Sequence, residues 1–216
     1  EAKEKDEWRY WQADLLLERG RDDEAKAILR SLMQQRGFYP MIAAQRLGEA
    51  FTFRIDKAPA TLDSALTSGP EMARVRELMY WNMDNTARSE WANLVTSRTK
   101  DQQAQLARYA FNQHWWDLSV QATIAGKLWD QLEERFPLAW NDLFSRYISG
   151  KDISQSYAMA IARQESAWNP KVRSPVGASG LMQIMPGTAT HTVGMFNIAG
   201  YGGPSQLLDP ETNINI

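Results

Sequence analysis

The 216-residue sequence contains no cysteine and only two histidines, His114 and His191. Without cysteine the chain forms no disulfide, no thiolate metal site and no cysteine nucleophile, and two isolated histidines do not supply a histidine-rich metal site. Phosphate-binding glycine motifs of the G-x-x-x-x-G-K or G-x-G-x-x-G type are absent as well. We therefore expect no metal and no cofactor.

The chain also lacks a large net charge, because 24 lysines and arginines against 26 acidic residues leave −2 at pH 7. No basic field is available to neutralise phosphates, which argues against nucleic acid or an anionic membrane surface as the main partner. Long apolar runs are missing too, and none approaches the roughly 18 to 20 residues that cross a bilayer. We expect neither nucleic-acid binding nor membrane insertion.

Helical periodicity is the main pattern that is present. Two apolar patterns flank Arg19-Gly20-Arg21 within the first 35 residues, which predicts an αα-hairpin, and looser versions recur over 75–95 and 106–124. Helical repeats of about 30 to 35 residues stack into solenoids. The predicted fold class is all-α. The apolar positions of the first hairpin are Trp8, Trp11, Leu15, Leu16, Ala25, Ile28, Leu29 and Leu32.

Breaks in this pattern divide the chain into parts. Proline, serine and threonine make 51–70 the segment with the poorest periodicity, and Phe136-Pro137 interrupts the pattern again. We predict a helical-repeat part over 1–50, a connector over 51–70, a second helical part over 71–137 and a final part over 138–216.

The final part contains a long segment without charge. From Ser174 to Leu208 there is no Asp, Glu, Lys or Arg, and seven glycines and three prolines interrupt any long helix. Such a segment does not form a solvated face. Two interpretations stay open, namely a buried loop system or the wall of a groove for an uncharged, hydroxyl-rich ligand.

A helix is predicted just before that segment. Asp152-Ile-Ser-Gln155 has the form of a capping box and Asn169-Pro170 ends the pattern, so the helix spans 153–168. Glu165 falls within its apolar stripe and is expected to face the core, where desolvation and the helix dipole favour the protonated form of a general acid. The alternative is a glutamate paired with Arg163 or placed at the edge of the stripe. The stripe comprises Ile153, Tyr157, Ala158, Ile161 and Trp168, with Met159 and Arg163 on the far side.

Other candidates have simpler interpretations. Gly177-Ala-Ser-Gly180 is one residue short of a G-x-S-x-G nucleophile motif. Trp115 and Trp116 could stack on sugar rings, but their spacing favours core positions. His191 has no partner residue at a metal-binding spacing and is expected at the surface.

Several motifs together resemble one family. The order of Glu165-Ser166, Asn169-Pro170, Gly180-Leu-Met-Gln183 and Thr188-Ala189 resembles the catalytic core of the soluble lytic murein transglycosylases, which have a goose-lysozyme-like fold. Residues 8–37 resemble the end of that family's helical superhelix and 71–137 its linker domain. The resemblance implies that 138–216 is an incomplete lysozyme-like domain, because the family's A-Y-N-A-G motif and a later tyrosine would lie beyond Ile216.

The resemblance also implies an activity. The family cleaves the β-1,4 bond between N-acetylmuramic acid and N-acetylglucosamine in peptidoglycan and leaves a 1,6-anhydromuramoyl end. Glu165 would be the single acid and base, while Ser174 would contact the acetamido group, and Gln183 and the backbone around Met185 would hold the glycan. The implied location is the periplasm, and the implied partners are peptidoglycan glycan strands.

Two expectations concern the chain as it stands, and two alternatives remain. We expect the 216-residue chain by itself to be inactive and to self-associate through uncovered apolar surface. The alternatives are a non-catalytic helical-repeat scaffold that binds peptidoglycan or a protein partner, and a hydrolytic lysozyme.

Overall fold

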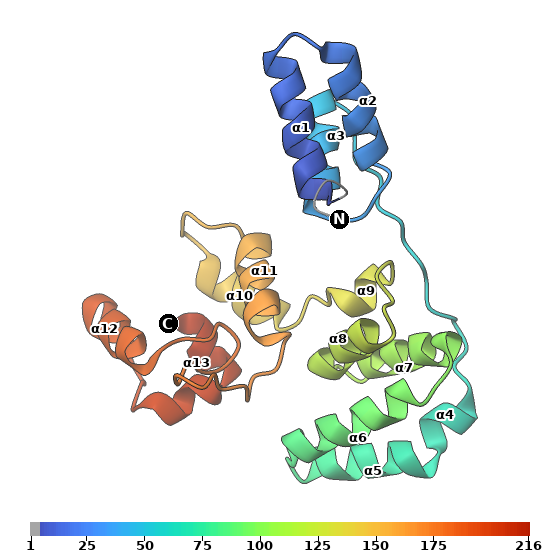
Figure 1. Cartoon of the computed structure of the whole chain (residues 1–216). Helices are drawn as coiled ribbons and strands as arrows, with labels where there is room; N and C mark the ends of the chain where they lie inside the picture. The colour runs from blue at the N-terminus through green and yellow to red at the C-terminus, as the bar shows by residue number, and fades with distance from the viewer. Residues whose placement is uncertain (1–4) are drawn as a thin grey trace. The chain divides into compact units, whose positions relative to one another are not determined.

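The computed structural model describes residues 5–216, and the regular structure of these residues is helical (Figure 1). They contain no β-strand, only two isolated antiparallel bridges, Arg173–Ser179 and Ser179–Ile184. The all-α prediction is confirmed. The helices are α1 Asp6–Glu18, α2 Asp22–Leu32, α3 Phe38–Leu47, α4 Ser64–Ser68, α5 Pro70–Tyr80, α6 Asp84–Thr96, α7 Lys100–Asn112, α8 Trp116–Ala125, α9 Leu132–Arg135, α10 Asn141–Ile148, α11 Gln155–Ser166, α12 Pro186–Phe196, the 3-10 helix η2 Pro204–Leu208, and α13 Pro210–Asn215.

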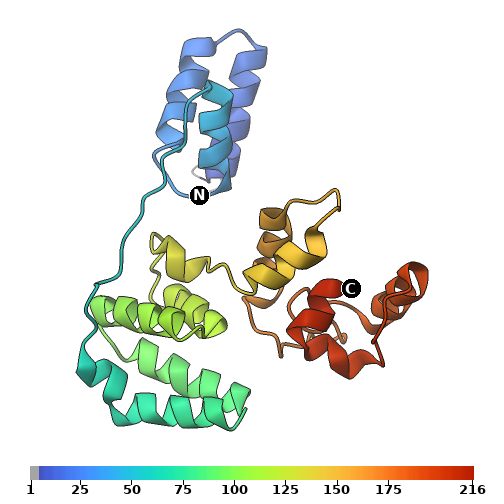
Figure 2. The same cartoon turned by 180° about the vertical axis from the view of Figure 1, so that it is seen from behind.

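The chain divides into two compact units, with the boundary between Ile55 and Asp56. In the first unit α1 and α2 form the expected hairpin, and α3 packs against both (Figures 1 and 2). The core of this unit is formed by Ala13, Ala25, Leu29, Leu32 and Ala43.

One feature of the first hairpin differs from its apolar pattern. Trp8 and Trp11 are 55% and 51% exposed, because α2 and α3 pack on the side of α1 that carries Ala13, Leu16 and Leu17. The large indoles were therefore a misleading guide to the buried face of α1.

The second unit begins with an irregular stretch and then two helical hairpins. Residues 51–63 have almost no regular structure, and α4 starts at Ser64, inside the range expected to be a connector. The pairs α5/α6 and α7/α8 then enclose a core centred on Trp91, whose Nε1–H donates to Leu118 O over 2.9 Å. The turn of the α5/α6 pair lies at 81–83, within the helical pattern predicted over 75–95.

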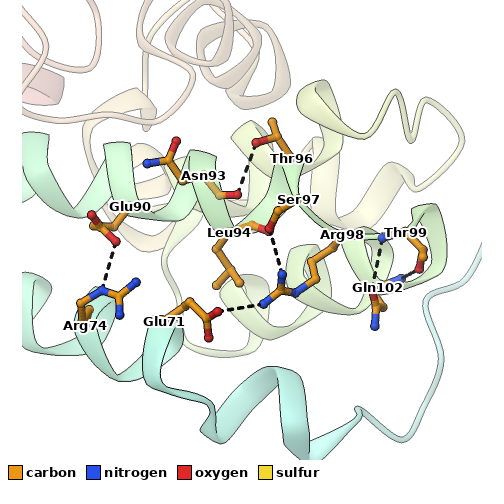
Figure 3. A network of polar contacts seen from close by, with 10 residues as sticks. All are labelled: Glu71, Arg74, Glu90, Asn93, Leu94, Thr96, Ser97, Arg98, Thr99 and Gln102. Atoms are coloured by element: carbon orange, nitrogen blue, oxygen red, sulfur yellow. Dashed lines mark hydrogen bonds and ion pairs between the residues drawn. The ribbon is translucent and has the colours of Figure 1, made fainter.

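Polar contacts at the ends of these helices add to the apolar core (Figure 3). The guanidinium of Arg98 donates to Ser97 Oγ over 2.9 Å and to Glu71 Oε1 over 3.3 Å, which links the end of α6 to the start of α5. Thr99 and Gln102 form a reciprocal capping box at the start of α7. These contacts fix where each helix starts, so the hairpins meet in a defined register.

Helix α8 belongs to two cores. Leu118 and Ala122 pack in the core of α5–α8, whereas Val120 packs in a second core with Phe144, Trp168 and Leu181. Trp115 is the N-cap of this helix and Trp116 is its first residue. Both are half-buried, the first against the earlier core and the second against the later one. The shared helix joins the α5–α8 region to the segment that carries Glu165.

Candidate active site

Helix α11 carries Glu165 in its last turn. Its N-terminal cap is Ser154, whose Oγ accepts from the N–H of Tyr157 over 3.2 Å, and not the expected Asp152. The helix ends at Ser166 rather than at 168, because Ala167 and Trp168 both adopt left-handed backbone angles, with φ of 48° and 65°. That sharp exit turns the Trp168 indole into the second core, where it is 1% exposed.

The buried face of α11 differs from the predicted stripe. Its buried residues are Ala158, Met159, Ala162 and Ser166, whereas Tyr157 is 62% exposed. Met159, expected on the far side, packs against Phe144 and its neighbours. The expectation that Glu165 faces the core was wrong, because the helix is rotated toward Met159 and the carboxylate lies on the exposed flank.

The alternative ion pair between Glu165 and Arg163 does not form either. The Nε–H of Arg163 donates to the carbonyl of Arg135 over 2.9 Å, and its guanidinium lies 5.3 Å from the ring centre of Phe136. Burial lowers the pKa of Arg163. Among residues 5–216, no side chain forms a hydrogen bond or ion pair with the Glu165 carboxylate, which leaves it free to meet a ligand.

Ser174 opens the loop that follows. Its Oγ accepts from the N–H of Ala178 over 3.0 Å, and its own N–H donates to the Ala178 carbonyl over 2.8 Å. Within the described part of the chain the Ser174 hydroxyl proton has no acceptor. The half-buried Ser174 can therefore donate one hydrogen bond to a ligand while its oxygen holds the turn.

Gln183 and Met185 lie at the far end of the same loop. The Gln183 side-chain nitrogen donates to the carbonyls of Val172 and Gly180, over 3.2 and 2.9 Å, so its N–H groups hold the loop and its Oε1 remains for a ligand. Gln183 also adopts a left-handed φ of 49°. Met185 precedes α12 and is partly exposed, and its carbonyl accepts from the N–H of Ala189.

The sequence analysis missed the residue that holds this loop in place. Asn213 in α13 is buried; its Oδ1 accepts from the N–H of Met182 over 2.7 Å and its Nδ2 donates to the carbonyls of Ser179 and Leu207. Gly180 lies against it, and a Cβ there would come within 2.0 Å of Leu207 O. No local pattern marks Asn213, because its partners lie up to 34 residues away.

The neighbouring acids are already engaged. Asp209 caps α13, and Glu211 accepts from Arg146 and Tyr147 over 2.9 and 2.7 Å. Between residues 153 and 208 the sequence has no acid other than Glu165. The described residues hold no group of three or more side chains suited to a metal ion, and none of their helices is long and apolar enough to cross a bilayer. The site therefore offers one unpaired carboxylate beside hydroxyl and amide groups.

Comparison with known proteins places both halves of the second unit in one class. Residues 65–132 match the profile of the soluble lytic murein transglycosylase L domain, and residues 142–216 match that of the transglycosylase SLT domain. Both domains define lytic transglycosylases.

Relatives along the whole chain give the particular family. A soluble lytic murein transglycosylase of Salmonella typhimurium is 85% identical over all 216 residues, which are 34% of its length. The crystal structure of the 70 kDa soluble lytic transglycosylase of Escherichia coli superposes with a TM-score of 0.95 at 83% identity, over 99% of this chain and 35% of that one. The chain belongs to the soluble lytic murein transglycosylases, and it spans about a third of the length of these relatives.

A more distant structure is that of an inactive mutant. The lytic transglycosylase Slt of Pseudomonas aeruginosa, solved as an inactive Glu-to-Gln mutant, is 32% identical to the chain and has a TM-score of 0.88. The superposition covers 99% of this chain and 35% of that one.

Proposed function

We propose that the chain carries the catalytic centre of a lytic transglycosylase that cleaves the β-1,4 bond between N-acetylmuramic acid and N-acetylglucosamine in peptidoglycan. The observation that carries this proposal is the unpaired carboxylate of Glu165, the only acid between residues 153 and 208. Loss of one glutamate inactivates the related Pseudomonas enzyme. The substrate lies outside the inner membrane, so the proposed location is the periplasm.

One carboxylate is enough if no water takes part in the reaction. The usual glycosidase needs two carboxyl groups about 5 to 9.5 Å apart. In the proposed route Glu165 protonates the glycosidic oxygen and the C1–O4 bond breaks, while the muramoyl N-acetyl oxygen stabilises C1. The C6 hydroxyl then attacks C1 and returns its proton to Glu165, which closes the 1,6-anhydro ring. Acid and base are the same residue.

The exposure of Glu165 is consistent with this route if the sugar itself excludes water. A glycan bound over the last turn of α11 would exclude water from the carboxylate and from the glycosidic oxygen. Ser174 would donate its free hydroxyl proton to the acetamido group, Gln183 would accept through Oε1, and the backbone around Met185 would line the groove. These roles use the atoms that the loop leaves unpaired.

The domain division is part of the same proposal. Residues 1–50 would be the end of a helical superhelix, 51–70 a connector, 71–137 a linker domain and 138–216 the lysozyme-like domain. The extended stretch before Ser64 and the shared helix α8 support this arrangement.

The first prediction tests Glu165. The test uses a chimeric protein in which the 216 residues replace the matching segment of the Salmonella relative, so that the chain has full length. The chimera is incubated with purified murein. Mass spectrometry should find 1,6-anhydromuramoyl ends, and Glu165→Gln should reduce their formation by at least about 1,000-fold, because an amide keeps the shape but cannot carry the proton.

Two comparisons complete this test. Glu211→Gln provides a matched control, because Glu211 lies in the same region and is already hydrogen-bonded to Arg146. This substitution should not change the products. Products with reducing ends would indicate a hydrolase, and unchanged turnover in Glu165→Gln would refute the role of Glu165. No cleavage by the grafted wild-type segment would favour a non-catalytic scaffold.

A further inference from the structure

The loop over 174–184 is tied to the helices around it by one side chain. Within the part of the chain that the structure describes, every hydrogen bond that this loop forms outside 172–184 is made with Asn213 of α13. Asn213 is only 1% exposed, so its side chain cannot itself touch a glycan. Any effect of Asn213 on a ligand must therefore pass through the loop.

The Asn213 amide uses its full hydrogen-bonding capacity. Its Oδ1 accepts from the N–H of Met182 over 2.7 Å, and its Nδ2 donates to the carbonyls of Ser179 and Leu207 over 2.9 and 2.8 Å. A side-chain amide offers one carbonyl acceptor and two N–H donors, and here all are used. Removing the amide leaves a buried N–H and two carbonyls without these partners.

One of these bonds lies next to a strained residue. Met182 directly precedes Gln183, which has a left-handed φ of 49°. For a residue with a Cβ this conformation persists only where surrounding contacts hold it. The contacts are the bonds from the Gln183 side-chain nitrogen to Val172 and Gly180, and the bond from the preceding peptide to Asn213. The conformation of Gln183 thus depends partly on Asn213.

We propose that Asn213 is a positioning residue for glycan binding, because it fixes the backbone at Met182 and so holds Gln183 in the conformation that meets the sugar. Without the amide, Gln183 relaxes toward ordinary backbone angles and the loop populates several arrangements. Affinity then falls, since only a fraction of the molecules is ready to bind. This inference rests on the proposed function, which makes a glycan the ligand of the loop.

Calorimetry tests the inference on the full-length chimera, with a stem-free tetrasaccharide of alternating N-acetylglucosamine and N-acetylmuramic acid as the probe. Every chain compared carries Glu165→Gln, so that no turnover occurs and this position does not titrate. Asn213→Ala should raise Kd at least about fivefold. A purely structural role would instead reduce the fraction of folded protein, and hence the stoichiometry, without changing Kd.

Asn213→Asp adds a readout that depends on pH. The introduced carboxyl keeps an acceptor for Met182 but, when ionised, offers no proton to the carbonyls of Ser179 and Leu207. When protonated, it donates to one of them. Burial raises its pKa, so acid pH favours the protonated form. Relative to the chain that keeps Asn213, Kd should be raised only about twofold at pH 5 and at least about tenfold at pH 8. The Asn213→Ala ratio should not change with pH.

Other titrating groups are removed from this comparison, because each Kd is divided by that of the Asn213 chain at the same pH. Asn215→Asp is the matched control, since it places the same charge on α13 where the native amide forms no side-chain hydrogen bond among residues 5–216. Its Kd should equal that of the Asn213 chain at both pH values. The charged and titratable residues of α13, of the elements that pack near it and of the loop segment are Asp209 and Glu211 in α13, Asp142, Arg146 and Tyr147 in α10, Arg163 in α11 and Arg173; η2 has none.

Three results would overturn the inference: an unchanged Kd in Asn213→Ala, a reduced stoichiometry with unchanged Kd, or an Asn213→Asp ratio that does not vary with pH. Circular dichroism at both pH values checks that each variant is folded, and Asn213→Asp at pH 5 serves as the test if Asn213→Ala does not fold. Absence of tetrasaccharide binding by the chain that keeps Asn213 would refute the proposed glycan ligand, and this inference with it. The two failures are thereby distinguished.

Discussion

At the scale of single residues, the candidate site depends on a glycine that has no room for a side chain. Gly180 combines a positive φ of 77° with a virtual Cβ 2.0 Å from Leu207 O and 2.3 Å from Asn213 Nδ2. Any substitution pushes the loop away from η2 and α13, and the three hydrogen bonds of Asn213 are lost with it.

Gly180→Ala should therefore lower the free energy of unfolding of the second unit by about 3 kcal/mol or more, since backbone strain and lost buried hydrogen bonds act together. Urea unfolding followed by tryptophan fluorescence measures the loss. Gly177→Ala is the matched control, because Gly177 has a φ of 97° but no heavy atom within 4 Å of its virtual Cβ. That variant should lose only about 1 kcal/mol, from backbone strain alone; equal losses in both would show that crowding at Gly180 is unimportant.

At the scale of an element, the short helix α9 holds two adjacent glutamates with opposite electrostatics. Both lie near Arg108, with Glu133 Oε2 at 2.5 Å and Glu134 Oε1 at 2.6 Å. The hydrogen bond from Arg108 lowers the pKa of the exposed Glu133, whereas burial raises the pKa of Glu134 despite the same cation. Desolvation outweighs the ion pair for Glu134, because its side chain is almost completely buried.

The two shifts predict opposite pH dependences. Folded Glu134 holds its proton to a higher pH than the unfolded chain, so stability falls as pH rises from the ordinary value of 4.5 through the folded pKa. The stability from Glu133 is present above 4.5 and is lost as pH falls through its folded pKa. Over pH 2 to 8, the stability difference from the wild type should rise with pH for Glu134→Gln, mainly above pH 4.5, and should fall with pH for Glu133→Gln, mainly below pH 4.5. Urea unfolding across that pH range measures the free energy of unfolding of each variant. If the stability differences of both variants changed with pH in the same direction, the opposite pKa shifts of Glu133 and Glu134 would be contradicted.

The helices themselves were largely predictable, but the face that each one buries was less so. The hairpin around Gly20 and a helix near 153–168 follow from local periodicity and caps. The rotation of α11 does not, because it is decided by Phe144 and Trp168 from other segments. The buried face of α1 could not be predicted from local sequence either, since packing by α2 and α3 buries Ala13 and leaves the indoles of Trp8 and Trp11 in solvent.

The candidate site shows a similar division. Motif resemblance was enough to select Glu165, Ser174 and Gln183, because these residue types occur in a specific order. It did not show that the Gln183 nitrogen is used within the loop, nor that Asn213 holds that loop, because both depend on contacts over 11 to 34 residues.

At the scale of the whole molecule, the two compact units have separate cores, and the chain between them lacks regular structure over 51–60. Arg54 and Lys57 lie in this stretch and are exposed. Brief trypsin treatment should cut there first and release two fragments that stay folded, because neither core is opened. Mass spectrometry identifies the cut. Arg98, between α6 and α7, and Lys100, the first residue of α7, are the internal control, since the contacts of Arg98 protect that turn. First cleavage there would contradict the two-unit description.

The hydrogen bonds of Asn213 also impose an order on synthesis. Ser179 leaves the ribosome 34 residues before the side chain that anchors it, an interval of about 2 to 7 s at usual translation rates. During that time Leu181, fully buried in the finished fold, has no closed loop to hold it. The candidate glycan-binding loop therefore cannot close before α13 is available to anchor it.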